Sequence, residues 1–457
     1  MCRSNFIAVP FEECRYCTST GARAAGGEAV SREHALEIWR AAVDAVRPQP
    51  LVRAAVESDP MIRAARRVLV VGAGKAGPGM AAGLEAALAD RLDRVEGLVN
   101  VPAGLTAPLR RVRLHAGRPQ GVNEPTAEGV AGAEEMLRLL AGAGPDDVAV
   151  CLLSGGGSAL LPAPVENVSL ADKLAVTKLL HRSGATIDEM NCVRKHLSRL
   201  KGGRLAQAFR GARLVSLIIS DVVGDPLDVI GSGPTAPDPT TFADALDVLT
   251  RYGLRDATPA SVLHHLEAGR GGLSPETPKQ APPSVENRVL GSNRIALDAA
   301  RHRAAALGYR VLDLGAFVEG ETREVATAVA GVVRSIWRDA EPLGPPACVL
   351  LGGETTVALG GAMGKGGRNQ EFVLALGVKL KSEMAGVTVL SAGTDGEDGP
   401  TDAAGAVADA ATLAQVGTAE EFLRRHDAYH FFERTGGLIK TGLTGTNVMD
   451  VRIVLMR

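Results

Sequence analysis

The stretch RVLVVGAGKAG at residues 67–77 predicts a buried strand that enters a glycine-rich turn and then a helix. Short aliphatic runs of this kind recur along the chain, and longer helix-compatible segments separate them. Such alternation is typical of α/β proteins with mostly parallel strands, because helices cover both faces of their sheets. We therefore predict an α/β fold. The other predicted strands lie at 95–101, 148–153, 214–220, 309–315, 347–353 and 386–393.

Most of these runs end in Gly, Ser or Asp. SGGGSA follows Leu153, SDVVGD follows Ile219, GGETT follows Leu351 and GTDGEDG follows Ala392. Parallel sheets bind their ligands beyond the carboxyl ends of the strands. We therefore expect the chemistry of this protein in these turns.

The length of 457 residues exceeds what one hydrophobic core usually supports, which predicts two domains. The Pro- and Gly-rich stretch at 271–284 is the best candidate for a linker. We assign residues 31–285 to a larger N-terminal domain and residues 286–457 to a smaller C-terminal domain. Ser31 is the expected N-cap of the first helix. Residues 1–30 lack periodicity and are expected to form a disordered extension.

Composition and charge narrow the class of protein. A net charge of -2 gives no reason to expect nucleic acid or an anionic membrane as a partner. No apolar segment approaches the ~18 residues of a membrane helix, and no secretory signal is evident. Cys151 and Cys348 sit in aliphatic runs as small hydrophobes, and Cys14 and Cys17 form an isolated C-x-x-C. We expect the reducing cytoplasm, and the oligomeric state stays open, with a homodimer as one alternative.

The turn at 72–77, GAGKAG, satisfies the pattern G-x-G-x-x-G. A nicotinamide-binding protein also needs an acidic residue at the end of its second strand, where this chain has Asn-Val-Pro at 100–102. Lys75 follows Gly74 at the expected start of a helix, and a cation there opposes the helix dipole unless an anion is near. A phosphate would supply that anion; the alternative is an exposed lysine in a solvated turn.

The turn SGGGSA places three glycines between Ser154 and Ser158. Consecutive backbone N–H groups and two hydroxyls suit an anion, and glycine lets the backbone approach a ligand closely. No Walker A sequence, G-x-x-x-x-G-K-[ST], occurs in the chain. The turn is therefore either a phosphate nest of another kind or simply a tight turn.

Two acidic turns could serve a metal or a proton transfer. Asp221 and Asp225 are spaced so that a turn can bring both to one Mg²⁺, although Asp225 before Pro226 also fits a plain turn residue. Asp395 lies in a glycine-broken acidic loop that lacks the spacing of an EF-hand. A general base or a second metal contact fits this loop better.

Basic residues follow in two segments. Arg368 comes after a glycine turn, and its planar fork suits a carboxylate or a phosphate, or it is a surface residue at a helix start. In a basic helical segment, Arg194 and Lys195 follow a turn and are candidates for the cleft. In the same segment, we expect Lys201 and Arg204 to be solvated and His196 to be structural.

Together these motifs resemble the glycerate 2-kinase family, whose C-terminal part is the MOFRL domain. The resemblance implies a Rossmann-like, mostly parallel N-terminal domain and a smaller C-terminal α/β domain, with the active site between them. It places the MOFRL region at about 345–457. The segments that carry the resemblance are 72-GAGKAG, 154-SGGGSALLPAP, 191-NCVRKHLSRLKGGRLA, 220-SDVVGD, 232-SGPT, 290-LGSNRIALDAA, 351-LGGETTV, 366-GGRNQEF, 393-GTDGEDGPTDAAGA and 441-TGLTGTNVMD.

The same resemblance implies ATP, Mg²⁺ and D-glycerate, with 2-phosphoglycerate as the product. The important Lys and Arg of the family map onto Lys75 and Arg368. Two departures exist: 118-RPQGVNE stands where the family usually has HPVPDE, and His-Asp-Ala at 426–428 stands where Asn-Asp-Ser is expected.

Phosphoryl transfer depends on positioning and on charge neutralisation. We expect glycine-lined corners from both halves of the chain to converge on one polyphosphate. The expected catalytic residues are Lys75, Arg368 and Asp395; the expected phosphate- and substrate-binding residues are Gly74, Ser154, Gly155, Gly156, Gly157, Ser158, Arg194 and Glu354; the expected metal ligands are Asp221 and Asp225.

Two other functions stay open at this point. One is an NAD(P)H-dependent hydroxypyruvate reductase, against which the missing acidic residue after the second strand argues. The other is a non-catalytic binding module on the same fold, against which the presence of Lys75, Asp221 and Arg368 argues.

Overall fold

The computed structural model describes residues 25–119, 121–361, 364–414 and 419–457. The expected N-terminal extension up to residue 24, with its C-x-x-C pair, lies outside the described residues. Helix α1 (Ala25–Ala45) already contains Ser31, so the prediction that the first helix starts there is wrong. A serine inside a helix gives the same local pattern as an N-cap serine, so the sequence signal does not locate the start.

Six strands form the parallel sheet of the N-terminal domain, in the order β3-β2-β1-β4-β5-β6. Four of them confirm predicted strands. β3 and β6 are absent from the prediction because their sequences, VRLHAGR and VENRVLG, mix charged with aliphatic residues. The strands are β1 (Val68–Ala73), β2 (Val95–Pro102), β3 (Val112–Arg118), β4 (Val148–Leu153), β5 (Arg213–Ile219) and β6 (Val285–Gly291).

This strand order is that of a doubly wound Rossmann-type sheet, which reverses its direction of growth between β1 and β4. The two strands pair in register from Val68 beside Val148 to Ala73 beside Leu153. The turns that follow them therefore begin side by side at the carboxyl edge and then lead to opposite faces. This point is where such sheets open a crevice for a ligand.

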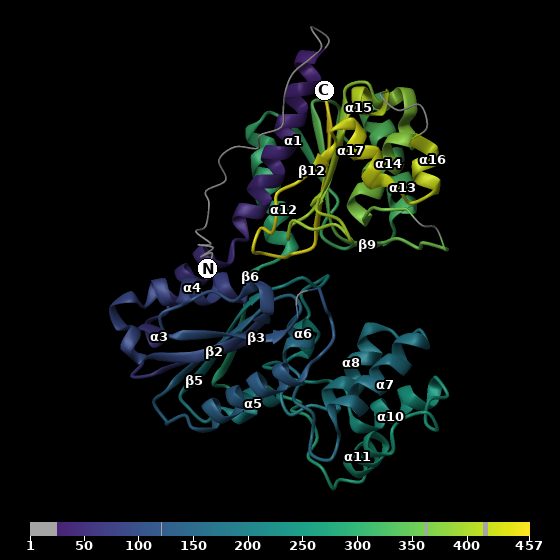
Figure 1. The fold of residues 1–457 in the computed structure, drawn as a ribbon. Helices are drawn as coiled ribbons and strands as arrows, with labels where there is room; N and C mark the ends of the chain where they lie inside the picture. Colours follow the sequence, from purple (N-terminus) through teal and green to yellow (C-terminus); the bar gives the residue numbers. More distant parts are fainter. Residues whose placement is uncertain (1–24, 120, 362–363, 415–418) are drawn as a thin grey trace, which may run out of the picture.

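Alternate residues of β1 pack against helices on opposite faces of the sheet. Val70 packs in the core with Met80 of α4, whereas Leu69 packs with Met136 of α5. A separate lobe of α7, α8, α10 and α11 lies beside this sheet (Figure 1). The helices are α2 (Pro48–Glu57), α3 (Pro60–Ala64), α4 (Gly77–Ala87), α5 (Ala127–Ala141), α6 (Gly157–Leu160), α7 (Leu170–Arg182), α8 (Ile187–His196), α9 (Arg204–Ala208), α10 (Phe242–Arg251) and α11 (Ala260–Arg270), with short turns η1 (Ala89–Arg94), η2 (Ala103–Leu105) and η3 (Ile230–Ser232).

The second sheet has seven strands in the order β12-β11-β10-β13-β9-β7, with β8 paired to β9. β9 runs straight through GGETT, so the glycine turn predicted after Leu351 is wrong; residues 353–356 pair with β8 instead. The strands are β7 (Arg310–Asp313), β8 (Val318–Glu321), β9 (Ala347–Thr356), β10 (Val387–Gly393), β11 (Gly405–Ala408), β12 (Leu438–Ile439) and β13 (Asp450–Met456).

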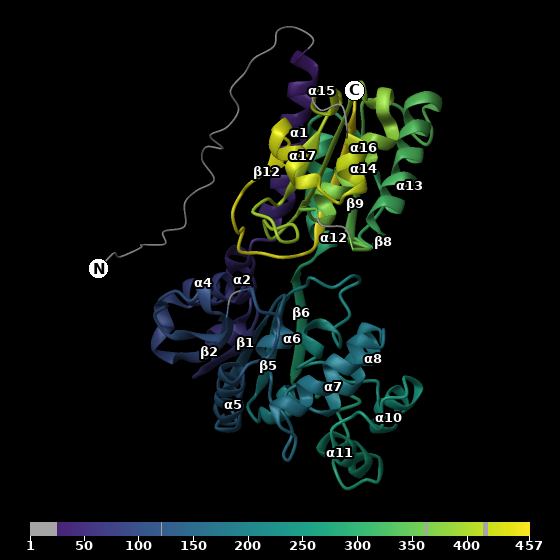
Figure 2. The ribbon, with the colours of Figure 1, turned by 45° about the vertical axis from the view of Figure 1, so that its right-hand side comes forward.

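Helices cover both faces of this mixed sheet. α1 and α12 lie on one face, and α13, α14, α16 and α17 lie on the other (Figures 1 and 2). The helices are α12 (Asn293–Ala306), α13 (Thr322–Arg334), α14 (Arg368–Leu380), α15 (Ala410–Ala414), α16 (Ala419–Arg424) and α17 (Ala428–Thr435), with turns η4 (Ser335–Asp339) and η5 (Lys381–Met384). No helix in the described residues is long and apolar enough to cross a membrane.

The chain crosses between the two sheets twice. α1 packs on α12 over the second sheet, whereas β6 pairs with β5 in the first. The predicted boundary between residues 285 and 286 instead places α1 in the N-terminal domain and nearly all of β6 in the C-terminal domain. One apolar cluster continues from Val70 and Met80 through Val46 to Ile453, so the two sheets share a core that fixes their edges relative to each other.

Candidate active site

A cavity of about 1260 Å³ lies beyond the carboxyl edge of the first sheet. Its walls come from the turn after β4, from α7 and α8, and from Phe317, Glu319, Glu354 and Thr356 of the second domain. Both domains therefore line it. Pockets for one small ligand usually reach up to about 1,000 Å³, so this cavity has room for a nucleotide together with a small acid.

The two glycine-rich turns after β1 and β4 pack together as one corner. The backbone N–H of Lys75 donates to the carbonyl of Gly155 at 2.8 Å, and the N–H of Ala76 donates to Oγ of Ser154 at 3.0 Å. This corner brings together the predicted phosphate-binding residues Gly74 and Ser154 to Ser158. Ser154, Gly156, Gly157 and Ser158 line the cavity.

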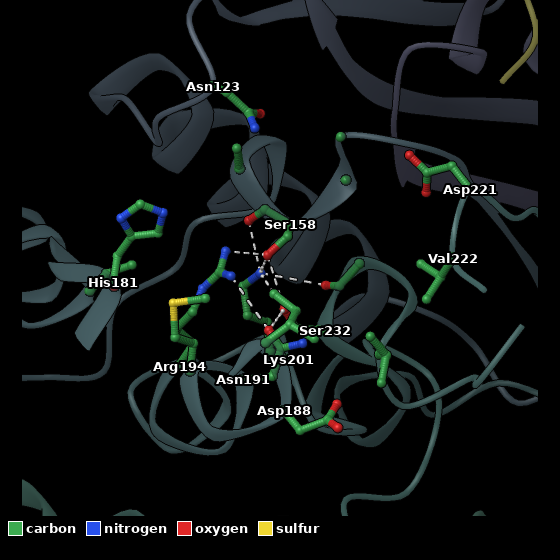
Figure 3. Close-up of a pocket in the computed structure, with 18 of the residues that line it drawn as sticks. Asn123, Ser158, His181, Asp188, Asn191, Arg194, Lys201, Asp221, Val222 and Ser232 are labelled. Carbon is green, nitrogen blue, oxygen red and sulfur yellow. Dashed lines mark hydrogen bonds between the residues drawn. The ribbon is translucent and has the colours of Figure 1, made fainter. Parts of the chain in front are cut away.

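Ser158 is the centre of a polar cluster at the inner end of the cavity (Figure 3). Its Oγ accepts hydrogen bonds from Nη2 of Arg194 and from Nζ of Lys201, the latter at 2.8 Å, and lies 2.9 Å from Oγ of Ser232. Arg194 thus lines the cavity as expected. Lys201 also lines it and is only 1 % exposed, so the prediction that Lys201 is solvated is wrong.

Three cations of this wall lack an acidic partner. Within the described part of the chain, Lys173, Arg194 and Lys201 form no ion pair. Burial and then the charges of Arg194 and Lys173 hold the pKa of Lys201 well below its usual range. Burial and then the charge of Arg194 lower the pKa of Lys173 to about 7. A bound anion would favour the charged forms of these side chains and raise their pKa values again, so the wall suits an anionic ligand.

Lys173 makes the stability of the protein depend on pH. Its folded pKa lies below its unfolded value, so the unfolded chain binds more protons between pH 7 and 10 and stability rises with pH there. Lys173→Met should remove on the order of 1 kcal/mol per pH unit of that rise. Urea unfolding at pH 7, 8 and 9 measures the effect, with Lys178→Met on the exposed side of the same helix as the control. If the free energy of unfolding changes with pH equally in wild type and Lys173→Met, the lowered pKa of Lys173 is contradicted.

Three carboxylates face the opposite side of the corner. Asp221 and Glu354 line the cavity, and Asp395 lies beside them. Burial and then the charge of Glu354 raise the pKa of Asp221 to about 6, and burial raises the pKa of Glu354 and of Asp395. A Cβ at Gly155 would collide with Oδ2 of Asp221, so glycine lets this carboxylate approach the corner closely. Like charges held this close favour a cation between them.

Lys75 joins the two domains at this corner. Its Nζ lies 3.9 Å from Oδ2 of Asp395 and 3.9 Å from Oε2 of Glu397, both in the loop after β10. Lys75 and Asp395 are not among the residues that line the large cavity, but Lys75 lies next to Gly156, which does line it: a Cβ at Gly156 would contact Cγ of Lys75 at 3.8 Å. The predicted corners from both halves of the chain therefore converge.

Arg368, the first residue of α14, is held by acidic partners. Its Nε and Nη2 donate to both carboxylate oxygens of Asp450 at 2.7 and 3.0 Å, and its Nη1 lies 2.8 Å from Oε1 of Glu354. Asp450 is fully buried and also accepts from Arg452 and Asn369. The guanidinium of Arg368 therefore binds carboxylates of the protein itself. Of these carboxylates, that of Glu354 lines the cavity.

The structure gives no support to two predicted site residues. Asp225 does not line the cavity, and its φ of +55° is that of a turn residue, the alternative that the sequence left open. Lys195 is buried in an ion pair with Asp228 and Asp238 rather than in the cleft, because adjacent helix residues point about 100° apart and Arg194 already faces the cavity. His196 is buried and hydrogen-bonded, which confirms its structural role.

Two segments depart from the family pattern, and one of them contributes residues to the cavity lining. Asn123 and Glu124, in the first, line the cavity, and Glu124 pairs with Lys178 at 3.0 Å. Asp427, in the second, accepts the backbone N–H of Lys365 at 3.0 Å and does not line the cavity.

Three polar residues of the site were not predicted from the sequence. Asp450 follows Val448 and Met449 at the start of a buried strand, and nothing local to it indicates that it binds Arg368. Lys201 lies in the basic segment, where solvation is the ordinary outcome. Lys173 did carry a signal, because it shares one helix face with Val176 and Leu180, which are buried.

Comparisons with protein families and known proteins agree with this geometry. Residues 34–267 match the domain of unknown function DUF4147, and residues 347–450 match the MOFRL family. The chain is 40 % identical over 395 residues to the glycerate 2-kinase of Pyrococcus horikoshii, which covers 85 % of this chain and 87 % of that protein. It is 39 % identical over 495 residues to the glycerate kinase of Homo sapiens, covering 93 % of each. A protein of Agrobacterium vitis with the provisional name hydroxypyruvate reductase is 44 % identical over 396 residues, covering 85 % of this chain and 87 % of that protein.

Solved structures give the same result. The crystal structure of a glycerate kinase from Thermotoga maritima superposes with a TM-score of 0.85 and 35 % identity, covering 94 % of this chain and all of that one. A crystal structure from Pyrococcus horikoshii superposes with a TM-score of 0.81 and 37 % identity, covering 93 % of this chain and 98 % of that one. The similarity thus includes both domains.

Proposed function

Because this chain belongs to the glycerate kinase family that combines the DUF4147 and MOFRL domains, we propose that it transfers the γ-phosphate of ATP to D-glycerate and forms 2-phosphoglycerate. The observation that carries the proposal is the joint corner at the switch point of the first sheet. There, Lys75 and the turn from Ser154 to Ser158 meet Asp221 and, from the other domain, Asp395. A nucleoside triphosphate with its metal requires backbone donors, a cation and carboxylates.

The residues of the corner suit distinct steps of phosphoryl transfer. The N–H groups and hydroxyls between Ser154 and Ser158 bind phosphate oxygens, and Lys75 stabilises the charge of the transferring group. Asp395, whose pKa burial raises, accepts the proton of the attacking hydroxyl. Arg368 acts as a positioning residue that holds Glu354 at the cavity.

The carboxylates also fit Mg²⁺. Within the described residues, no three His, Cys, Asp or Glu side chains are arranged to hold a metal, yet Mg²⁺ usually takes only one or two carboxylates together with water and phosphate oxygens. Asp221 and Glu354 would supply those carboxylates, and Asp225 would not. When bound, Mg²⁺ neutralises charge on the phosphate oxygens.

Asp221→Asn should raise the Mg²⁺ concentration for half-maximal activity by at least about 10-fold, because it removes a charged ligand. Initial rates at fixed total ATP and varied Mg²⁺ measure this. Asp225→Asn is a matched control, since asparagine tolerates the same left-handed backbone and Asp225 does not line the cavity. An equal shift in both variants would reject the metal assignment.

A hydroxypyruvate reductase is less well supported. At the end of β2, where a dinucleotide-binding protein carries an acidic residue for the ribose, this chain has Asn100. Asn100 is fully buried, and its Nδ2 donates to the carbonyls of Gly129 and Leu160. Its side chain therefore has a structural role.

Phosphorus NMR of the product from ATP and D-glycerate tests the proposed function. A resonance of 2-phosphoglycerate together with ADP is expected. The 3-phosphate would correct the regiochemistry, and NADH oxidation with hydroxypyruvate, in the absence of ADP formation, would replace the kinase by the reductase.

A further inference from the structure

The ammonium group of Lys201 is buried among neutral oxygens. Its Nζ donates to the carbonyl and Oγ of Ser158, both at 2.8 Å, to Oγ of Ser232 at 3.2 Å and to the carbonyl of Gly231 at 3.4 Å. These oxygens satisfy its hydrogen bonds but do not neutralise its charge. A fully buried charge normally has an opposite charge beside it.

The neighbours of Lys201 make this charge less favourable. Arg194 donates to the same Oγ of Ser158, and its remaining contact in the described residues is a long one to Oδ1 of Asn191 at 3.4 Å. Lys173 lies close enough to lower the pKa of Lys201 further, after burial and Arg194. Three cations thus converge on one wall of the cavity, within a part of the chain where none of them forms an ion pair.

The cavity is divided by charge. Figure 3 shows Arg194 and Lys201 gathered around Ser158, with Asp221 on the opposite side of the same turn. The carboxylate side, with Asp221 and Glu354, fits a metal and the polyphosphate bound to it. A free carboxylate of a small acid would be repelled there and attracted to the cationic wall.

We propose that Lys201 and Arg194, aligned by Ser158 and Ser232, form the subsite that binds the carboxylate of the hydroxy acid. The planar fork of Arg194 matches the two oxygens of a carboxylate, and the point charge of Lys201 adds to the attraction. The hydroxyl of the bound acid then faces the glycine corner, where the phosphate is delivered. This inference rests on the proposed function and adds the residues that select an acidic acceptor.

Calorimetric titration of the full-length protein with D-glycerate, and separately with ADP, tests the subsite. Lys201→Met should weaken D-glycerate binding by about 10- to 100-fold, because it removes a positive charge near the bound carboxylate, and should change the Kd of ADP by less than about 3-fold. Lys201→Arg should restore part of the loss because it keeps the charge. Arg199→Met is the matched control: Arg199 is in the same segment, pairs with Glu134 and lies outside the cavity, so both affinities should stay unchanged.

Other outcomes are equally clear. Loss of ADP binding with D-glycerate binding retained would assign the subsite to a phosphate and overturn the proposal, and so would a Lys201→Met protein that binds both ligands normally. Thermal unfolding checks the fold: a single cooperative transition shows that Lys201→Met is folded when its binding is measured. If Lys201→Met does not fold, Arg194→Met carries the same expectation for D-glycerate. A wild type that binds D-glycerate through Lys201 but forms no ADP would refute the kinase and leave the subsite standing.

Discussion

Replacing Lys75 by Ala should lower kcat by about 1,000-fold, the scale on which a preorganised charge acts in phosphoryl transfer. The fold should be unaffected. The backbone N–H of Lys75, not its side chain, joins the two glycine turns, and the side chain is 40 % exposed. A cation just before the N-terminus of α4 also opposes the helix dipole, so its removal carries no penalty there.

Steady-state kinetics at saturating ATP, Mg²⁺ and D-glycerate measure the effect, and a thermal unfolding curve checks the fold. Lys75→Arg separates charge from geometry, because Arg keeps the charge and cannot reproduce the compact ammonium beside Asp395. Lys440→Ala, at a surface ion pair with Asp402, is the control that should retain full activity. A kcat for Lys75→Ala within about 3-fold of wild type would remove Lys75 from the mechanism.

The strands of the first sheet were predictable because their signal is local. β1, β4 and β5 are almost wholly buried, and nearly every residue in them is aliphatic, so a short window of sequence identifies each. β13, DVRIVLM, carries a buried arginine, Arg452, whose Nη2 donates to Asp450 and to Thr355 of β9. No window around residues 450–456 contains that information, and the central strand of the second sheet was missed.

The assignment of elements to domains failed for a similar reason. α1 is an amphipathic helix at the start of the chain, and its pattern shows that it buries one face without showing which sheet it covers. Only the packing on α12, far along the chain, places it on the second sheet. Its neighbour α2 packs on α4 of the first sheet, so the shared core passes through this pair of helices.

Within the site, turns were predictable and charge pairing was not. The glycine turns after β1 and β4 follow directly from the strands that precede them, and the parallel sheet brings them together. Whether a lysine ends up solvated, paired or buried depends on residues far away in the sequence: Lys201 meets Ser158, 43 positions earlier. Likewise, Lys195 pairs with Asp238 and Arg368 pairs with Asp450, which lie far from them in the sequence.

Arg368→Ala should destabilise the protein by about 3 kcal/mol in addition to lowering activity, because it removes one partner of a buried ion pair. Asp450 is fully buried, and although burial alone would raise its pKa, Arg452 and Arg368 together hold that pKa below its usual range. Without Arg368, part of that charge is left uncompensated. Urea unfolding measures the loss, and kcat reports how far the positioning of Glu354 depends on Arg368.

Glu354→Gln separates these two effects, since Glu354 contacts the other side of the same guanidinium. Its side chain is 44 % exposed, so losing this ion pair should cost less than about 1 kcal/mol of stability while activity still falls. Arg368 would then be a residue whose buried side holds the second domain together and whose cavity side positions a metal-binding carboxylate. If Arg368→Ala and Glu354→Gln unfold at the same urea concentration, the pair with Asp450 contributes little. Arg368 would in that case act on the cavity alone.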